Sequence, residues 1–231
     1  MVRFQKQISK TSGERLPRGT SCTTAGCHRV ARGLLPVWLF GVFFVFIQPV
    51  QAEDPGTWFD AHGVDLIKVY EDLHSHPELS FHEKETAARL ASELRTAGFD
   101  VTTGIGGHGV VGLLKNGDGP TVMFRTDLDA LPVTEETGLP YASKVTTQDD
   151  SGATVGVMHA CGHDIHMTNV IAVARYSATH RDQWRGTLML IGQPAEERVD
   201  GALEMLRDGL YTRFPKPQFA IALHTDCLLY T

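Results

Sequence analysis

The sequence predicts an α/β fold in which helices cover a mixed, largely parallel sheet. Segments with helical periodicity alternate with short, nearly continuous apolar runs between residues 58 and 223. Such runs are typical of strands that are buried on both faces, as in the parallel sheets of α/β proteins. Side chains able to bind metal ions or move protons follow three of these runs, which is where ligands gather in open α/β sheets.

Apolar spacing, together with proline and glycine residues, sets the expected order of the elements. Helices are expected at residues 58–73, 82–97, 164–177 and 201–210, and strands at 99–103, 110–114, 122–125, 187–191 and 219–223. The first helix should end before Pro77, because proline cannot continue a helix, and Gly98 marks the end of the second. The turn at residues 115–119 separates two strands, and no repeat or linker is evident.

Residues 1–52 have the organisation of a secretory signal peptide. Basic side chains precede the apolar run at 34–47, and residues 50–52 offer a small-residue cleavage site. The apolar run has 14 residues, fewer than the ~20 that span a bilayer. We expect cleavage near Glu53 and a secreted or periplasmic protein, with an uncleaved membrane anchor as the alternative. The basic segment is long, so the true start codon is expected downstream of Met1.

The charge of residues 53–231 argues against one class of partner. This part carries 14 basic and 26 acidic side chains, whereas residues 1–52 carry seven basic and one acidic. Nucleic-acid binding needs a basic surface, so no nucleic-acid partner is expected. Only Cys161 and Cys227 remain after the leader, too few for a disulfide framework.

Residues 158–166 form the densest group of reactive side chains. They contain one thiol, three imidazoles and one carboxylate, with Gly162 between Cys161 and His163. A thiolate and an imidazole at this spacing can face one ion from a tight turn, and the pair favours zinc or a similar divalent ion. His159 and His166 receive no ligand role.

Glu196 and Glu197 follow the predicted strand at 187–191. One could bind a metal ion while the other takes a proton from water, and a solvated helix start is the alternative. His224 follows the strand at 219–223. Alone it would be weak evidence for a metal site, since histidines in such positions are often structural.

Asp127 and Asp129 follow the strand at 122–125 and lie on the same side of an extended segment. Either could bind metal or orient a ligand imidazole, and a polar turn is the alternative.

The glycines of residues 104–109 match the dinucleotide-binding spacing Gly-x-Gly-x-x-Gly. A strand-like segment follows them, so no helix N-terminus would receive a pyrophosphate. We interpret these residues as a flexible turn. The alternative interpretation, a nucleotide-dependent oxidoreductase, is therefore supported by this motif alone.

Four motifs occur in a characteristic order: DLHSHPELS at 72–80, RTDLDALP at 125–132, HACGHD at 159–164 and QPAEE at 193–197. Together they closely resemble the amidohydrolase branch of the aminoacylase/carboxypeptidase-type zinc metallopeptidases. That branch includes hippurate hydrolases, N-acyl-amino-acid amidohydrolases and auxin-conjugate hydrolases. The resemblance runs from about residue 58 to residue 226. It implies hydrolysis of an amide bond in small N-acyl amino acids or short peptides.

The resemblance also implies a centre of two divalent ions, zinc or manganese, with cobalt or nickel as alternatives. Cys161 would bridge the ions, and His163 and His224 would complete one of them. Glu197 would bind the other. Glu196 would act as the general base that activates water and later protonates the leaving amine. Asp129 would support the ligands from behind, with Asp127 near it.

The chain departs from the family pattern after His224. The family takes a further histidine ligand from far toward the C-terminus, and it has a separate domain that mediates dimerisation and closes on substrate. Without that histidine one ion keeps only Cys161 and Glu197, fewer than the three protein ligands usual for catalytic zinc. We expect residues 53–226 to be the N-terminal part of a catalytic domain, inactive alone, and a homodimer for the full-length protein.

Residues 227–231 are expected to be a non-native tail. They can be encoded by TGT CTC TTA TAC ACA, which reads like a transposase mosaic-end adapter. A non-catalytic or vestigial metal-binding domain of the same fold is the main alternative to an enzyme.

Overall fold

The computed structural model describes residues 53–225, and the predicted signal peptide and non-native tail lie outside them. Five α-helices, a 3-10 helix and seven strands follow one another within this part of the chain. Their bounds are α1 Pro55–Ser75, α2 Lys84–Thr96, β1 Asp100–Ile105, β2 Gly109–Asn116, β3 Thr121–Asp127, β4 Thr146–Gln148, β5 Thr154–Gly156, α3 His163–Thr179, η1 Arg181–Gln183, β6 Gly186–Gln193, α4 Gly201–Arg207, α5 Leu210–Arg213 and β7 Phe219–Ala222. Among the described residues, no helix is both long and apolar enough to cross a membrane.

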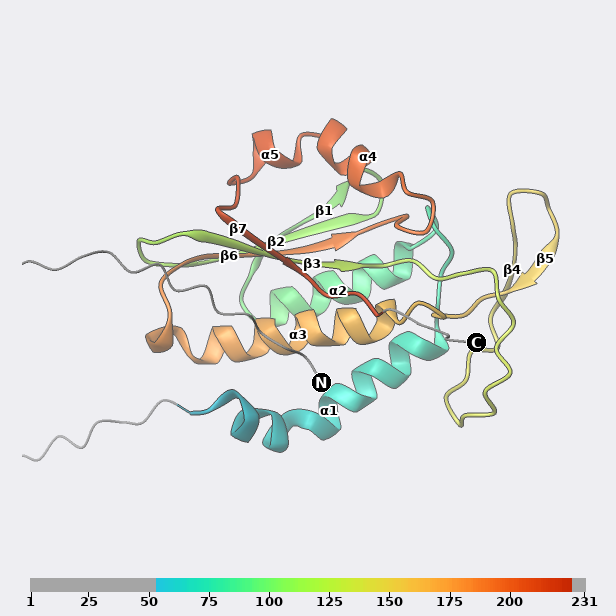
Figure 1. Cartoon of the computed structure of the whole chain (residues 1–231), viewed down its shortest axis with the longest axis horizontal. Helices are drawn as coiled ribbons and strands as arrows, with labels where there is room; N and C mark the ends of the chain where they lie inside the picture. The colour runs from blue at the N-terminus through green and yellow to red at the C-terminus, as the bar shows by residue number, and fades with distance from the viewer. Residues whose placement is uncertain (1–52, 226–231) are drawn as a thin grey trace, which may run out of the picture. The chain divides into compact units, whose positions relative to one another are not determined.

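A five-stranded mixed sheet in the order β1-β2-β6-β3-β7 forms the centre of the fold. β3 pairs in parallel with both β6 and β7, whereas β2 is antiparallel to β1 and β6. Four strands therefore point one way and only β2 points the other. The predicted mixed, largely parallel sheet is confirmed. Figure 1 shows α1, α2 and α3 on one face of the sheet and α4 and α5 on the other.

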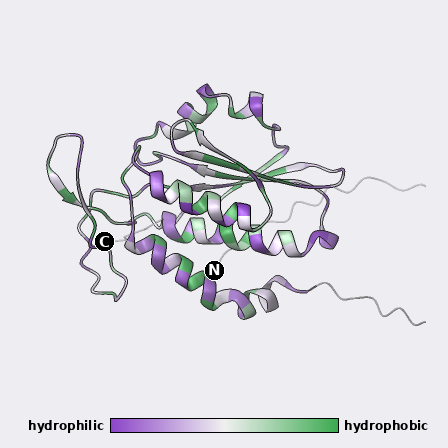
Figure 2. Ribbon diagram, turned by 180° about the vertical axis from the view of Figure 1, so that it is seen from behind, coloured by the Kyte–Doolittle hydropathy of each residue, from purple (hydrophilic) through white to green (hydrophobic). Residues whose placement is uncertain are grey.

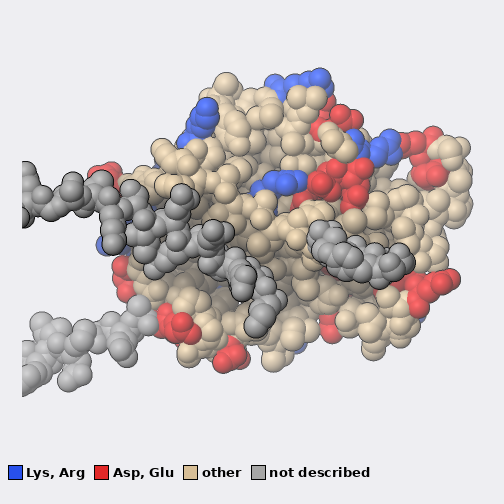
Figure 3. Space-filling model, viewed as in Figure 1, with Lys and Arg blue, Asp and Glu red and all other residues tan. Residues whose placement is uncertain are grey.

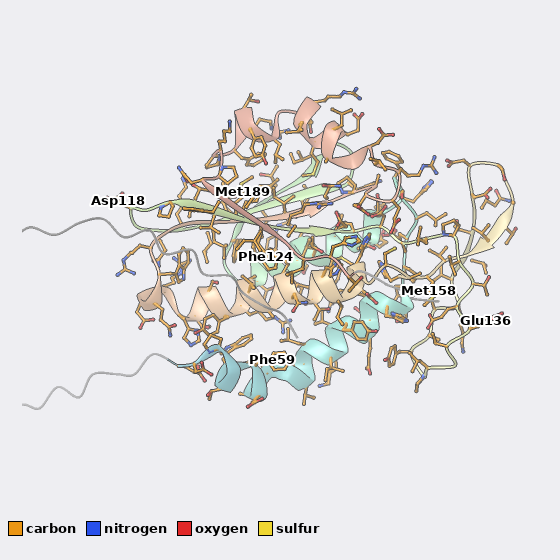
Figure 4. All side chains as sticks on the ribbon, in the orientation of Figure 1. Phe59, Asp118, Phe124, Glu136, Met158 and Met189 are labelled. Atoms are coloured by element: carbon orange, nitrogen blue, oxygen red, sulfur yellow. The ribbon has the colours of Figure 1, made fainter. Side chains whose placement is uncertain are left out.

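Alternating side chains of the strands build a separate apolar core on each face. Phe124 and Leu190 are paired across β3 and β6 and pack with the helices α1, α2 and α3. The next pair along, Met123 and Met189, belongs to the second core with Met205 of α4. Phe124 and Met189 mark the two faces in Figure 4, and Figure 2 shows the hydrophobic residues concentrated along the strands. This two-residue period is the one expected of strands buried on both sides.

Two local features differ from the sequence predictions. The helix expected at 201–210 ends at Arg207, because Gly209 adopts the left-handed conformation (φ 88°) and a second short helix, α5, begins after it. The antiparallel hairpin of β4 and β5 was not predicted. Its strands are only three residues long and mostly exposed, so they carry no apolar alternation. The side chain of Asp149 holds the hairpin turn by accepting hydrogen bonds from the backbone of Ser151 and Ala153.

Candidate metal centre

The parallel part of the sheet brings three strand ends to one edge. Asp127 is the last residue of β3, Glu196 and Glu197 follow the end of β6, and His224 follows β7. Because β6 and β7 flank β3 on its two sides, their carboxyl ends lie next to each other. The predicted gathering of these side chains is therefore what the sheet topology produces. Figure 3 shows acidic side chains collected near a basic one below α4 on this part of the surface.

His163 reaches the same place from the other side, at the first turn of α3. Gly162 precedes it in the left-handed conformation (φ 74°), which turns the chain sharply into the helix. The His163 side chain is almost completely buried, and its Nδ1–H donates to the backbone carbonyl of Asp129 at 2.8 Å. A carbonyl oxygen can only accept, so this bond fixes the orientation of the ring. Nε2 then points to the strand ends.

Four side chains meet around His163 Nε2. Asp127, His163, Glu196 and His224 each offer a ligand atom, and these atoms lie within 4.8 Å of one another. His163 Nε2 is 3.7 Å from Glu196 Oε2, which is 4.0 Å from His224 Nε2. Asp127 also pairs with the guanidinium of Arg125. Imidazole and carboxylate ligands in this number and proximity fit a divalent ion such as zinc.

Glu197 and Cys161 lie on the adjacent side of His163. Glu197 Oε1 is 3.7 Å from His163 Nε2, and the Glu197 carboxylate is near enough to the Cys161 thiol to raise its pKa. His163 Nε2 and Glu197 Oε1 are both buried and lack a hydrogen-bond partner among the described residues. Buried polar atoms normally have hydrogen-bond partners. These two atoms have none and lie 3.7 Å apart, which indicates a site for a cation.

Asp129 supports the site from behind and does not point into the cluster. It is fully buried, and its Oδ2 accepts hydrogen bonds from Ser80 Oγ at 2.6 Å and from the backbone N–H of Glu197 at 3.0 Å. Its backbone carbonyl receives the His163 Nδ1–H. Asp129 thus fixes two of the predicted ligands, His163 and Glu197, relative to each other.

Burial and crowded carboxylates favour the protonated forms of three groups in the centre. Burial and the nearby carboxylates, Glu197 first among them, raise the pKa of the Cys161 thiol to about 12. Burial alone would lower the pKa of His163, but Asp129 and Asp127 raise it to about 9. Burial raises the pKa of Asp127 to about 6 against the opposing effect of Arg125. For all three groups the neighbouring carboxylates add to the preference for the protonated form, and a divalent cation would neutralise their negative charge.

The structure brings together all six residues selected from the sequence. His163, Glu196 and His224 share one cluster, Cys161 and Glu197 flank it, and Asp129 holds it from behind; their roles stay predictions. Asp127 joins the ligand cluster as a fourth member. The sequence predicts Asp127 near the site without a definite role, because alternation along the strand cannot distinguish Asp127 from Asp129.

A second buried network behind the centre was not predicted from the sequence. His74, on α1, contacts Asp164 Oδ2 through Nδ1 at 2.6 Å and Glu135 Oε1 through Nε2 at 3.1 Å. The side chains of all three are nearly or fully buried. Burial alone would lower the pKa of His74, but the two carboxylates raise it above its usual value. This network joins α1, the first turn of α3 and the segment after β3, and no sequence spacing signals it.

Comparisons with known proteins agree with the geometry. Residues 123–227 match the model of peptidase family M20/M25/M40. The hippurate hydrolase of Campylobacter jejuni is 43% identical over 151 residues, which cover 65% of this chain and 37% of that protein. An N-acetylcysteine deacetylase of Bacillus subtilis is 38% identical over 151 residues, covering 63% of this chain and 36% of that protein.

Solved structures show the same relationship. The Bacillus subtilis protein YxeP, described as a dinuclear metal binding peptidase from the M20 family, superposes with a TM-score of 0.63 at 36% identity, covering 72% of this chain and 44% of that one. The predicted resemblance to the amidohydrolase branch of these metallopeptidases is confirmed, and so is the fold of the catalytic domain. The chain spans little more than a third of the length of the curated relatives named above.

The raised pKa of Cys161 makes its reactivity testable in the metal-free protein. We expect iodoacetamide at pH 8, with EDTA present, to label Cys161 on the order of a hundredfold or more slowly in the folded chain than in the urea-unfolded chain, because only the thiolate reacts. Mass spectrometry of the labelled peptide measures the rate. Glu197→Gln should accelerate labelling, whereas the same change at the exposed Glu136 should not. Labelling of the folded chain at the unfolded rate would contradict the assigned environment.

The His74 network predicts a pH-dependent contribution to stability. Folding raises the pKa of His74, so its protonated form stabilises the folded chain. This stabilisation is fully present at pH values below the pKa in the unfolded chain, about 6.5, and is lost as the pH rises through the pKa in the folded chain. We expect His74→Gln to lower the free energy of unfolding by roughly 3 kcal/mol at pH 6 and by less as the pH rises above the unfolded pKa. Urea unfolding across this range measures the difference. His76→Gln, at an exposed histidine, is the control. If His74→Gln lowers the free energy of unfolding equally at every pH, His74 is not stabilised in its protonated form.

Proposed function

We propose that the full-length protein hydrolyses the amide bond of N-acyl amino acids or short peptides at a centre of two divalent ions. The observation that carries this proposal is the pair of buried, unpartnered atoms His163 Nε2 and Glu197 Oε1, 3.7 Å apart, beside the carboxylate of Glu196. The names of the relatives support it, since they describe an amide hydrolase and a deacetylase.

The ligand assignment rests on the family resemblance, and the proximity of these side chains supports it. Cys161, His163 and His224 would hold one ion, and Cys161 and Glu197 would hold the other. Asp127 lies close enough to contribute to the first ion. The thiol of Cys161 must lose its proton to bind, so metal loading should be coupled to proton release. Zinc or manganese fits this mixed set of sulfur, nitrogen and oxygen ligands.

The divalent ions, when bound, would supply Lewis-acid chemistry toward the substrate carbonyl. Glu196 is the residue placed to move protons, because its carboxylate lies beside His163 and His224 and its side chain is 30% exposed, open to water and substrate. It takes one proton from the attacking water as the new C–O bond forms. It returns that proton to the amine nitrogen as the C–N bond breaks, giving a carboxylic acid and a free amine. The acid then releases the second proton of the attacking water to solvent and leaves as a carboxylate.

Asp129 contributes through position and not through proton transfer. Its carboxylate fixes the Glu197 backbone and its carbonyl fixes the His163 ring, so the ligands are held before an ion arrives. Such support reduces the reorganisation needed when the ion binds. Export and dimerisation of the full-length protein are part of the same proposal and rest on the leader and on the family resemblance.

Replacing the proposed general base, Glu196, tests the proposal. In the full-length protein loaded with zinc or manganese, we expect Glu196→Gln to lower kcat for N-acyl amino acid hydrolysis by about 10²- to 10⁴-fold while leaving metal content unchanged. Release of the amino acid measures turnover, and Glu136→Gln, in a loop away from the centre, is the matched control (Figure 4). Wild-type turnover by Glu196→Gln would refute the mechanism. Metal binding without cleavage of any amide or peptide would favour a non-catalytic metal-binding domain.

A further inference from the structure

His224 lies beyond the part of β7 that the sheet holds in place. The last paired residue of β7 is Ala222, opposite Arg125, and β7 forms an edge of the sheet. The His224 side chain is half exposed, and within residues 53–225 its Nδ1 is hydrogen-bonded only to the carbonyl of Thr225. The sheet alone therefore does not determine where this ring lies.

The next residue, Thr225, is attached at two points, one in the first turn of α3 and one in the turn that precedes this helix. Its backbone N–H donates to Nε2 of His166 at 3.0 Å, and its hydroxyl donates to the carbonyl of Cys161 at 2.5 Å. It also lies directly on Gly162, where an added Cβ would come within 3.0 Å of the Thr225 hydroxyl oxygen. Thr225 thus joins the segment after β7 to the turn that carries Cys161 and His163.

His166 is placed to serve as the fixed half of this attachment. It lies one turn after His163 on α3, it is 3% exposed, and its ring is 5.5 Å from that of His224. Because Nε2 accepts the Thr225 N–H, the ring is neutral with its proton on Nδ1. A buried side chain on a packed helix can hold a backbone group with little freedom, unlike a surface side chain.

We propose that His166 and Thr225 form a clamp that positions His224 against Cys161 and His163, which makes His166 a positioning residue of the centre. The clamp explains why a buried histidine without a ligand role lies beside two predicted ligands, His163 and His224. The consequence for metal binding rests on the proposed function, whereas the clamp itself can be examined without metal.

The first test measures the clamp in the metal-free chain. Amide hydrogen exchange at Thr225, followed by NMR, should be at least roughly tenfold slower in the wild type than in His166→Leu. His166→Gln keeps an acceptor near the position of Nε2 and should restore most of the protection. Unchanged exchange in the α3 amides shows that the variants remain folded. A Thr225 amide that exchanges equally fast in the wild type and in His166→Leu overturns the proposal.

The second test asks whether His166 acts through His224. Titration with Co²⁺, read from its visible absorption, should show affinity about 10- to 100-fold lower in His166→Leu than in the wild type. His166→Gln should recover part of that loss, and His166→Leu should cost little more in a His224→Ala background. Equal losses in both backgrounds would refute action through His224. A wild-type chain that binds no Co²⁺ would instead count against the proposed metal centre, and the exchange measurement would still decide the clamp.

Discussion

The parallel ladder of β6, β3 and β7 is the constraint on which the rest of this structure depends. Its register places Asp127 opposite Gln193 and pairs Arg125 with both Ile191 and Ala222. The chain segments leaving the three strands therefore begin at one level and carry their polar side chains to one place. A sheet that ran antiparallel through β3 would send these residues to opposite ends of the molecule.

That arrangement brings carboxylates close together, and their mutual repulsion determines the chemistry of the site. The carboxylates of Asp127, Asp129, Glu196 and Glu197 gather around His163, and the guanidinium of Arg125 pairs with only one of them, Asp127. Burial and the carboxylates raise the pKa of Cys161, and Asp129 and Asp127 raise that of His163, so both groups favour their protonated forms. Divalent ions that replace those protons would neutralise the same negative charge. The Cys161 thiolate and the His163 imidazole would then act as ligands. The site is thus preorganised by charge as well as by position.

Regular elements and the site motifs were predictable because both leave a local signal. Apolar periodicity identified the long helices and all five strands of the sheet, and the strand-end position of Glu196, Glu197 and His224 followed from them. The β4–β5 hairpin left no such signal, since its turn is held by the side chain of Asp149 and not by burial.

Long-range contacts between polar side chains could not be read from the sequence. The contacts of His74 with Asp164 and Glu135 join residues 90 and 61 positions apart, and that of Thr225 with His166 spans 59. The position of Asp127 in the ligand cluster likewise depends on how the end of β3 meets α3. These features are produced by tertiary packing, and single-sequence patterns do not encode them.

X-ray absorption spectroscopy of the zinc-loaded chain can establish whether the strand ends and the turn before α3 form one cation site. We expect a shell of nitrogen and oxygen scatterers with one sulfur at about 2.3 Å, and loss of that sulfur in Cys161→Ser. In His163→Ala we expect loss of a nitrogen scatterer. A shell without sulfur, or one that neither substitution changes, would show that these residues do not form one cation site.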